Sequence, residues 1–149
     1  MKNVTRLVTS CFGLGKIPIA PGTFGSLGGV AVYFVVKNNT AVYGAAIALL
    51  FALGMIFSGR AEKESGANDP GNVVIDEASG MLTCLFLLPY SILLVAAGFL
   101  IFRVLDIMKP PPCRAIEKQG GSWGIMGDDL IAAIYTNLIL QIIFRVFLA

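Results

Sequence analysis

The stretch Phe102–Asp129, FRVLDIMKPPPCRAIEKQGGSWGIMGDD, decides how we expect this chain to fold. It contains four of the eleven basic residues and four of the nine acidic residues of a sequence that is otherwise mostly apolar. Arg103 and Asp106 stand three positions apart, so they share one face at the end of a helix. The run Pro110–Pro112 then prevents this helix from continuing. We therefore expect a polar connection between two apolar helices.

The glycine-rich end of this stretch, Gly120–Gly127, leads to two adjacent carboxylates. These are Asp128 and Asp129, at the predicted start of a last apolar helix over residues 130–149. Acidic side chains are stabilised at a helix N-terminus by the helix dipole. The pair therefore has two interpretations, a cap of the last helix or part of a functional site, and the local pattern leaves both open.

The composition of the whole chain indicates an integral membrane protein with a single domain, residues 1–149. The 149 residues are 56% hydrophobic and 13% charged, and the mean hydropathy is +0.81, whereas soluble domains carry roughly 25% charged residues. A net charge of +2, without a basic stripe interleaved with aromatic residues, argues against nucleic-acid binding. The chain has no histidine, which excludes histidine-based catalysis, and its three cysteines lack metal-ligand spacing.

Apolar and polar segments alternate along the first half of the chain. Residues 1–20 predict a helix that lies on the membrane surface. The segment Ala20–Ser26 predicts a breaker-rich loop, which forms either a simple turn and cap or an anion site made of backbone N–H groups. Residues 38–59 are 22 positions without a charge, enough to span a bilayer. Residues 60–77 predict a polar loop, in which Glu62 is expected on a solvated face.

The next apolar segment, residues 78–102, carries no charge but is interrupted at Pro89–Ser91. It forms either one kinked span or a hairpin of two short helices. Basic residues are enriched on the cytoplasmic side of membrane proteins. The hairpin places nine basic residues on one side and two on the other, whereas the single span divides them six and five. The bias favours the hairpin, so we predict an all-α fold: a compact, membrane-embedded bundle of about five to six helices, several of them short or re-entrant.

The hairpin gathers carboxylates from three separate segments on one polar face, beside two basic residues. Clustered carboxylates without histidine suit a hard divalent ion, typically Mg²⁺, which takes oxygen ligands and keeps several waters. Such an ion can neutralise a phosphate and activate a water, and Arg and Lys can hold phosphate oxygens. These residue types predict a Mg²⁺-dependent enzyme acting on a lipid phosphate. The residues are Asp76, Glu77, Asp106, Asp128 and Asp129, with Arg103 and Lys109.

Four blocks of the sequence resemble the motifs of bacterial phosphatidylglycerophosphatase A, in the family's order and at similar spacing. They are Pro21–Ser26 (PGTFGS), Val74–Gly80 (VIDEASG), Phe102–Pro112 (FRVLDIMKPPP) and Gly120–Asp129 (GGSWGIMGDD). The resemblance covers nearly the whole chain. It implies an all-helical fold and the Mg²⁺-dependent hydrolysis of phosphatidylglycerophosphate to phosphatidylglycerol and phosphate. It also implies a place in the bacterial inner membrane, with the active site facing the cytoplasm.

The resemblance also implies residue roles. The catalytic positions that it implies are Asp76, Glu77, Asp106, Asp128 and Asp129. The implied substrate-binding positions are Arg103, Lys109, Thr23 and Ser26. The implied Mg²⁺ ligands are drawn from Asp76, Asp106, Asp128 and Asp129. One remaining carboxylate is expected to act as base or nucleophile, and both direct attack by water and a phospho-aspartyl intermediate stay open.

Three other classes of protein compete with this hypothesis. A CDP-alcohol phosphatidyltransferase also uses Mg²⁺ and aspartates, but it needs a regular run of four aspartates around an Ala-Arg step, which this sequence lacks. A small membrane transporter would place carboxylates deep inside its spans, whereas we expect those of this chain at or beyond the span boundaries. A purely structural membrane subunit would tolerate Asp106→Asn and Asp129→Asn.

Overall fold

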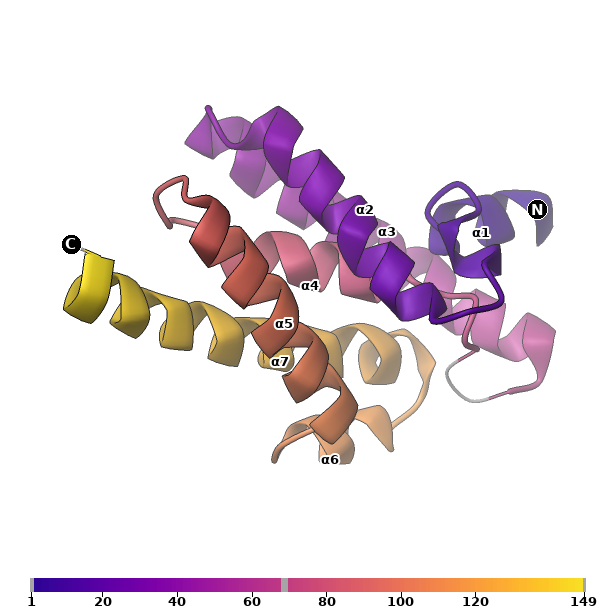
Figure 1. The fold of residues 1–149 in the computed structure, drawn as a ribbon. Helices are drawn as coiled ribbons and strands as arrows, with labels where there is room; N and C mark the ends of the chain where they lie inside the picture. The colour runs from indigo at the N-terminus through magenta and orange to yellow at the C-terminus, as the bar shows by residue number, and fades with distance from the viewer. Residues whose placement is uncertain (1, 68–69, 149) are drawn as a thin grey trace.

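The computed structural model describes residues 2–67 and 70–148, which form seven α-helices and no β-strand (Figure 1). The all-α prediction is confirmed, and the two shortest helices, at the N-terminus and after the proline run, bring the number above the five or six expected. A 3₁₀ turn lies at Leu14–Lys16, and a π-helical turn over Phe144–Leu148 continues the last helix. The α-helices are α1 Lys2–Thr9, α2 Pro21–Val36, α3 Thr40–Ser65, α4 Ile75–Leu85, α5 Ile92–Met108, α6 Cys113–Glu117 and α7 Gly121–Ile143.

Helix α4 is the centre of the bundle. Nine of its eleven residues are buried, and it packs against α2, α3, α5 and α7. Glycine allows α2 to come very close, because a Cβ at Gly29 would lie only 2.6 Å from the carbonyl oxygen of Ala78. The short helix that carries Asp76 and Glu77 is therefore held from several sides, and its first turn is fixed in place.

Helices α4 and α5 form the predicted hairpin. The first ends at Leu85 and the second begins at Ile92, and the two run in opposite directions, so the start of one lies near the end of the other (Figure 1). The side-chain amide of Asn137 in α7 donates to the carbonyl oxygens of Cys84 and Phe86, at 2.9 Å each, and so binds the backbone at the turn. The alternative of a single kinked span is wrong.

Two predicted loops are helical. The segment Ala20–Ser26 contains the first turns of α2, which begins at Pro21; proline suits the first position of a helix because its missing N–H would have no partner there. Helix α3 continues six residues beyond the predicted boundary at 59 and ends before Gly66, which adopts a left-handed backbone with φ 73°. The predicted loop 60–77 is thus helical at both ends, since residues 60–65 belong to α3 and residues 75–77 to α4, and its residues 68–69 lie outside the described residues.

Helix α7 begins nine residues earlier than predicted, at Gly121 rather than at 130. Asp128 and Asp129 therefore lie in its third turn, and the interpretation that they cap this helix is wrong. The last residue of the predicted 130–149 helix, Ala149, lies outside the described residues.

Within the described part of the chain, two helices are long and apolar enough to cross a membrane, judged by length and composition: Thr40–Ser65 and Gly121–Phe147. The outer surface of the bundle carries many large apolar side chains, among them Val35, Leu49, Leu100, Leu138, Ile142 and Phe147. A surface this apolar marks a site of contact with protein or membrane. Both features agree with the membrane-embedded bundle predicted from the sequence.

Candidate functional site

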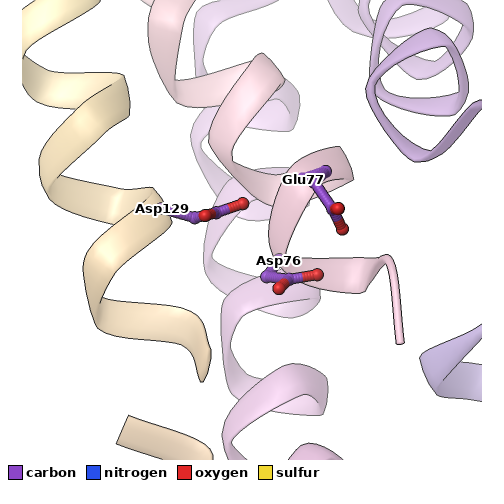
Figure 2. Close-up of side chains that lie close together, drawn as sticks. All are labelled: Asp76, Glu77 and Asp129. Carbon is purple, nitrogen blue, oxygen red and sulfur yellow. The ribbon is translucent and has the colours of Figure 1, made fainter. Parts of the chain in front are cut away.

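Three carboxylates from two helices converge beside the centre of the bundle. Asp76 and Glu77 occupy the first turn of α4, and Asp129 reaches toward them from α7 (Figure 2). One carboxylate oxygen from each residue lies within 4.8 Å of the other two. The N-terminus of α4 favours negative charge through its dipole, but two buried acidic residues in one turn exceed what a cap needs.

The burial of this acidic cluster, Asp76, Glu77 and Asp129, makes it chemically unusual. Asp76 is 6% exposed, Asp129 is 4% exposed, and the Glu77 side chain is 14% exposed. Among the described residues, Glu77 Oε2 and Asp129 Oδ2 are buried without a hydrogen-bond partner. Buried charged oxygens are costly unless a partner compensates them. A hard cation with oxygen ligands fits these donors, so the acidic cluster is a candidate Mg²⁺ site.

Burial raises the pKa of Glu77 above its usual range, and the charge of Asp106 adds to this effect. A hydrogen bond with Asp76 and the charge of Arg103 act in the opposite direction. The main cause is burial, which deprives the ionised Glu77 carboxylate of water, and a bound cation would compensate for that loss.

One basic residue, Arg103 near the end of α5, lies beside the acidic cluster. Its Nη1 is 2.6 Å from Asp106 Oδ2 and 3.9 Å from Glu77 Oε1. Asp106 also lies close enough to Asp129 to share a hydrogen bond with it. The Arg103 and Asp106 side chains are 18% and 12% exposed, so this pair lies at the edge of the site, between the cluster and the surface.

The start of α2 completes this edge. A Cβ at Gly22 would lie 3.0 Å from Arg103 Nη2 and closer still to Glu77 Oε1, so a larger residue here would have to displace these charged groups. The motif Pro21–Ser26 therefore adjoins the acidic cluster, although as a helix start rather than as the expected loop. Thr23 follows directly and is partly buried.

Ser26 makes its side-chain hydrogen bond within its own helix. Its side chain is fully buried, and its hydroxyl donates to the carbonyl oxygen of Gly22, at 3.0 Å, within the same helix. A serine hydroxyl four residues after a carbonyl commonly makes this bond. The position of Ser26 therefore gives no support to the prediction that it contacts substrate.

Lys109 and Asp128 belong to a second, separate cluster. Lys109 Nζ lies 2.7 Å from Asp128 Oδ2 and 2.5 Å from Glu117 Oε1. Burial alone would lower the pKa of Lys109, but the hydrogen bonds and charges of Asp128 and Glu117 outweigh it and raise that pKa above the usual lysine range. Lys109 is thus a firmly charged partner of a buried carboxylate. In this geometry Asp128 and Lys109 pair with each other and stand outside the cluster of Asp76, Glu77 and Asp129, so the ligand role of Asp128 and the phosphate-binding role of Lys109 stay predictions.

The structure therefore rearranges the predicted site. It brings Asp76, Glu77 and Asp129 together, with Asp106 and Arg103 at the edge. Glu77, expected only as a catalytic residue, belongs to the candidate metal site, whereas Asp128, expected among the ligands, lies outside this group. Asp128 is held by Lys109, which also pairs with Glu117, a residue that no sequence signal had singled out.

Two further contacts, both missed in the sequence, set the position of α7. Glu62 in α3, expected on a solvated face, accepts a hydrogen bond from the backbone N–H of Gly121 at 2.7 Å and so caps α7. Ser122 accepts one from the backbone N–H of Gly59 at 2.8 Å. These two bonds clamp the start of α7 to α3, and Asp129 lies on the same face of α7 as Ser122, seven residues further along.

Comparison with known proteins gives a consistent result. A family model described as phosphatidylglycerophosphatase A matches residues 7–144. The chain is 36% identical over 146 residues to phosphatidylglycerophosphatase A of Escherichia coli (strain K12), an alignment that covers 96% of this chain and 85% of that relative. It is also 36% identical over 141 residues to the protein of the same name from Haemophilus influenzae, covering 92% of this chain and 86% of the relative.

A third relative, from Bacteroides thetaiotaomicron, carries the provisional name phosphatidylinositol-3-phosphatase. It is 32% identical over 144 residues, covering 91% of this chain and 91% of the relative. No solved structure matches the chain.

Proposed function

Because the chain belongs to the phosphatidylglycerophosphatase A family, we propose that it hydrolyses phosphatidylglycerophosphate to phosphatidylglycerol and inorganic phosphate. The observation that carries this proposal is the acidic cluster, whose three carboxylates, two buried and one partly buried, have oxygen atoms within 4.8 Å of one another beside Arg103. A phosphate monoester needs both a cation for its charge and a donor for its oxygens, and this arrangement can supply the two together.

Asp76, Glu77 and Asp129 are the residues that would hold Mg²⁺, through their carboxylate oxygens. When bound there, the ion would neutralise phosphate charge and acidify a water. Support comes from the buried Glu77 and Asp129 oxygens that lack a hydrogen-bond partner among the described residues. In this proposal Asp128 is not a ligand, since Lys109 already neutralises it.

Arg103 is proposed to bind the phosphate. A guanidinium carries five N–H donors, so it can stay paired with Asp106 while other donors meet phosphate oxygens. Asp106 orients Arg103 and is the carboxylate left for the role of base or nucleophile, because it borders Asp129 without belonging to the acidic cluster.

Two routes fit this arrangement. In direct hydrolysis, water loses a proton to the base and attacks phosphorus, and the bond from phosphorus to the glycerol oxygen breaks. In the two-step route, a carboxylate attacks phosphorus and the bond to the glycerol oxygen breaks; water then cleaves the acyl phosphate, which frees the carboxylate and releases inorganic phosphate. In both routes the departing glycerol oxygen takes up a proton and leaves as an alcohol. Rapid acid quenching with labelled substrate separates them, since only the second route leaves protein-bound phosphate that hydroxylamine releases.

The activity is tested with purified protein in mixed micelles. We expect phosphate release from phosphatidylglycerophosphate that EDTA abolishes and Mg²⁺ restores, and a loss of release in Asp129→Asn. Glu64→Gln, which changes an exposed acid at the end of α3, serves as the matched control. Phosphatidylinositol 3-phosphate belongs in the same substrate panel because of the third relative. Folded protein that releases no phosphate from phosphatidylglycerophosphate would contradict the proposal.

We also propose that the site faces the cytoplasm at the bacterial inner membrane. The basic residues near the site, such as Lys109, Arg114 and Lys118, outnumber those at the opposite end, where Lys37 lies between α2 and α3. In a variant without native cysteines, Lys118→Cys should resist a membrane-impermeant thiol reagent added to intact cells, and Asn38→Cys should react. The reverse pattern would place the site on the outer side.

A further inference from the structure

An apolar cavity lies apart from the acidic cluster. It has a volume of about 330 Å³ and lies between α2 and α3, with the turn after α1 above it and the start of α4 below it. Its walls are apolar side chains, including Leu14, Ala31, Val32, Leu50 and Ile75. Binding pockets for small molecules have volumes of roughly 300–1,000 Å³, so this cavity can hold an elongated apolar group.

The cavity adjoins the acidic cluster through two helices. On α4, its wall residues Ile75 and Ala78 flank Asp76 and Glu77 in the sequence. On α2, Gly22 touches the site, and the first wall residue, Gly28, follows six positions later. At 1.5 Å per residue, that is about 9 Å along the helix.

The Cys11 thiol marks the junction between the two. It lines the cavity and donates a weak hydrogen bond to the carbonyl oxygen of Val74, at 3.8 Å. Burial, followed by the charge of Glu77, raises the pKa of Cys11 to about 11. The cavity wall is therefore close enough to the acidic cluster for the charge of Glu77 to act on the Cys11 thiol.

The mouth of the cavity has a strained backbone. Cys11 and Phe12 both adopt left-handed conformations, with φ 46° and φ 59°, which non-glycine residues avoid. The result is that Phe12, one of the cavity residues, projects outward with 86% of its surface exposed. An aromatic ring held out beside an apolar opening suits a membrane interface and not water.

We propose that this cavity binds one acyl chain of the phospholipid substrate while the acidic cluster holds its terminal phosphate. The inference rests on the proposed function. The substrate joins its terminal phosphate to its acyl chains through a glycerol, a phosphodiester and a second glycerol, which is long enough to cover the separation along α2. The apolar helices around the opening indicate that the occupant comes from the bilayer, and the nearby site selects the substrate over other lipids.

The test compares long-chain and short-chain substrates. Ala31→Phe fills the cavity from α2, and Ala96→Phe adds the same ring at an exposed position of α5 outside the cavity. Wild-type protein should hydrolyse dioleoyl phosphatidylglycerophosphate with a lower KM than the dihexanoyl form. Ala31→Phe should raise KM for the dioleoyl form, by roughly fourfold for each methylene displaced (about 0.8 kcal/mol each), and leave the dihexanoyl form unchanged. Ala96→Phe should change neither.

Crosslinking gives a readout that does not depend on activity. A phosphatidylglycerophosphate with a diazirine in one acyl chain should label residues 8–14 and 28–32 of the wild-type protein in mixed micelles, and an excess of unlabelled substrate should compete. The inference is overturned if the label falls only on the outer faces of the helices, or if Ala31→Phe affects both substrates equally. A wild-type protein that is labelled in the cavity but releases no phosphate would count against the proposed function and not against the cavity.

Discussion

Replacing Lys109 by methionine should destabilise the fold, because it leaves a buried carboxylate without its positive partner. Lys109 Nζ lies 2.7 Å from Asp128, which is only 4% exposed. Removing one partner of a fully buried ion pair costs roughly 3–5 kcal/mol. The side chains of Lys109 and Glu117 are 19% and 36% exposed, so water screens part of this loss, and we expect about 2–3 kcal/mol.

The measurement is chemical unfolding in detergent, followed by circular dichroism. Lys109→Met combined with Asp128→Leu should recover at least half of the loss, because the double variant also removes the buried charge. If the single variant unfolds within about 0.5 kcal/mol of wild type, or if the two changes are additive, the ion pair does not stabilise the fold. Lys109 would then be free for the phosphate-binding role predicted from the sequence.

The pH dependence of this effect has a defined sign. The pKa of Lys109 is higher in the folded protein than in the unfolded chain. Its stabilising contribution is therefore complete below the ordinary lysine pKa and is lost only as the pH rises through the folded-state value. The difference in unfolding free energy between wild type and Lys109→Met should stay constant from about pH 7 to pH 9.

Four further predictions concern the site. Asp129→Asn should lower the rate of phosphate release by roughly 100-fold or more, measured as an initial rate, with the helical circular dichroism spectrum retained. Gly22→Ala should reduce kcat/KM at least about tenfold, because the added methyl group meets Glu77 and Arg103. The control is Gly71→Ala, whose methyl group meets nothing within 4 Å and which should keep the wild-type kcat/KM. Ser122→Ala should lower the free energy of unfolding by about 1 kcal/mol, measured with denaturant. Because the pKa of Glu77 is raised, Glu77 should take up a proton at a higher pH than an ordinary glutamate, and Mg²⁺ binding should weaken there. The measurement is the rise in Tm that Mg²⁺ produces, which should become smaller as the pH falls. An unchanged rise down to about pH 4 would contradict this prediction.

The sequence was sufficient for the hairpin and for the gathering of charges. Pro89 breaks a long apolar segment, and the excess of basic residues on one side selects the arrangement in which Glu77 and Arg103 meet. Both signals are strong because backbone hydrogen bonding and membrane sidedness constrain them directly. The ion pair between Arg103 and Glu77 shows that the two ends do come together.

The choice between Asp128 and Asp129 could not be read from the sequence. Neighbouring residues on a helix point about 100° apart, so only the rotation of α7 about its axis decides which one joins Asp76 and Glu77. That rotation is set by contacts with α3, more than 55 residues earlier: Glu62 with Gly121, and Ser122 with Gly59. Such long-range contacts have no local signature, which is also why Glu62 was expected in solvent.

The side-chain amide of Asn137 holds the hairpin turn in place from another helix, so the turn does not depend on its own loop residues alone. This side chain already binds the carbonyl groups of Cys84 and Phe86. Leu87 and Tyr90, the two ends of the following loop, are 67% and 57% exposed. A change in this loop should therefore disturb few backbone contacts. A short epitope or a fluorophore could be grafted there without disturbing the catalytic end of the helices. The turn thus offers a built-in attachment point for following the orientation of the protein in living cells.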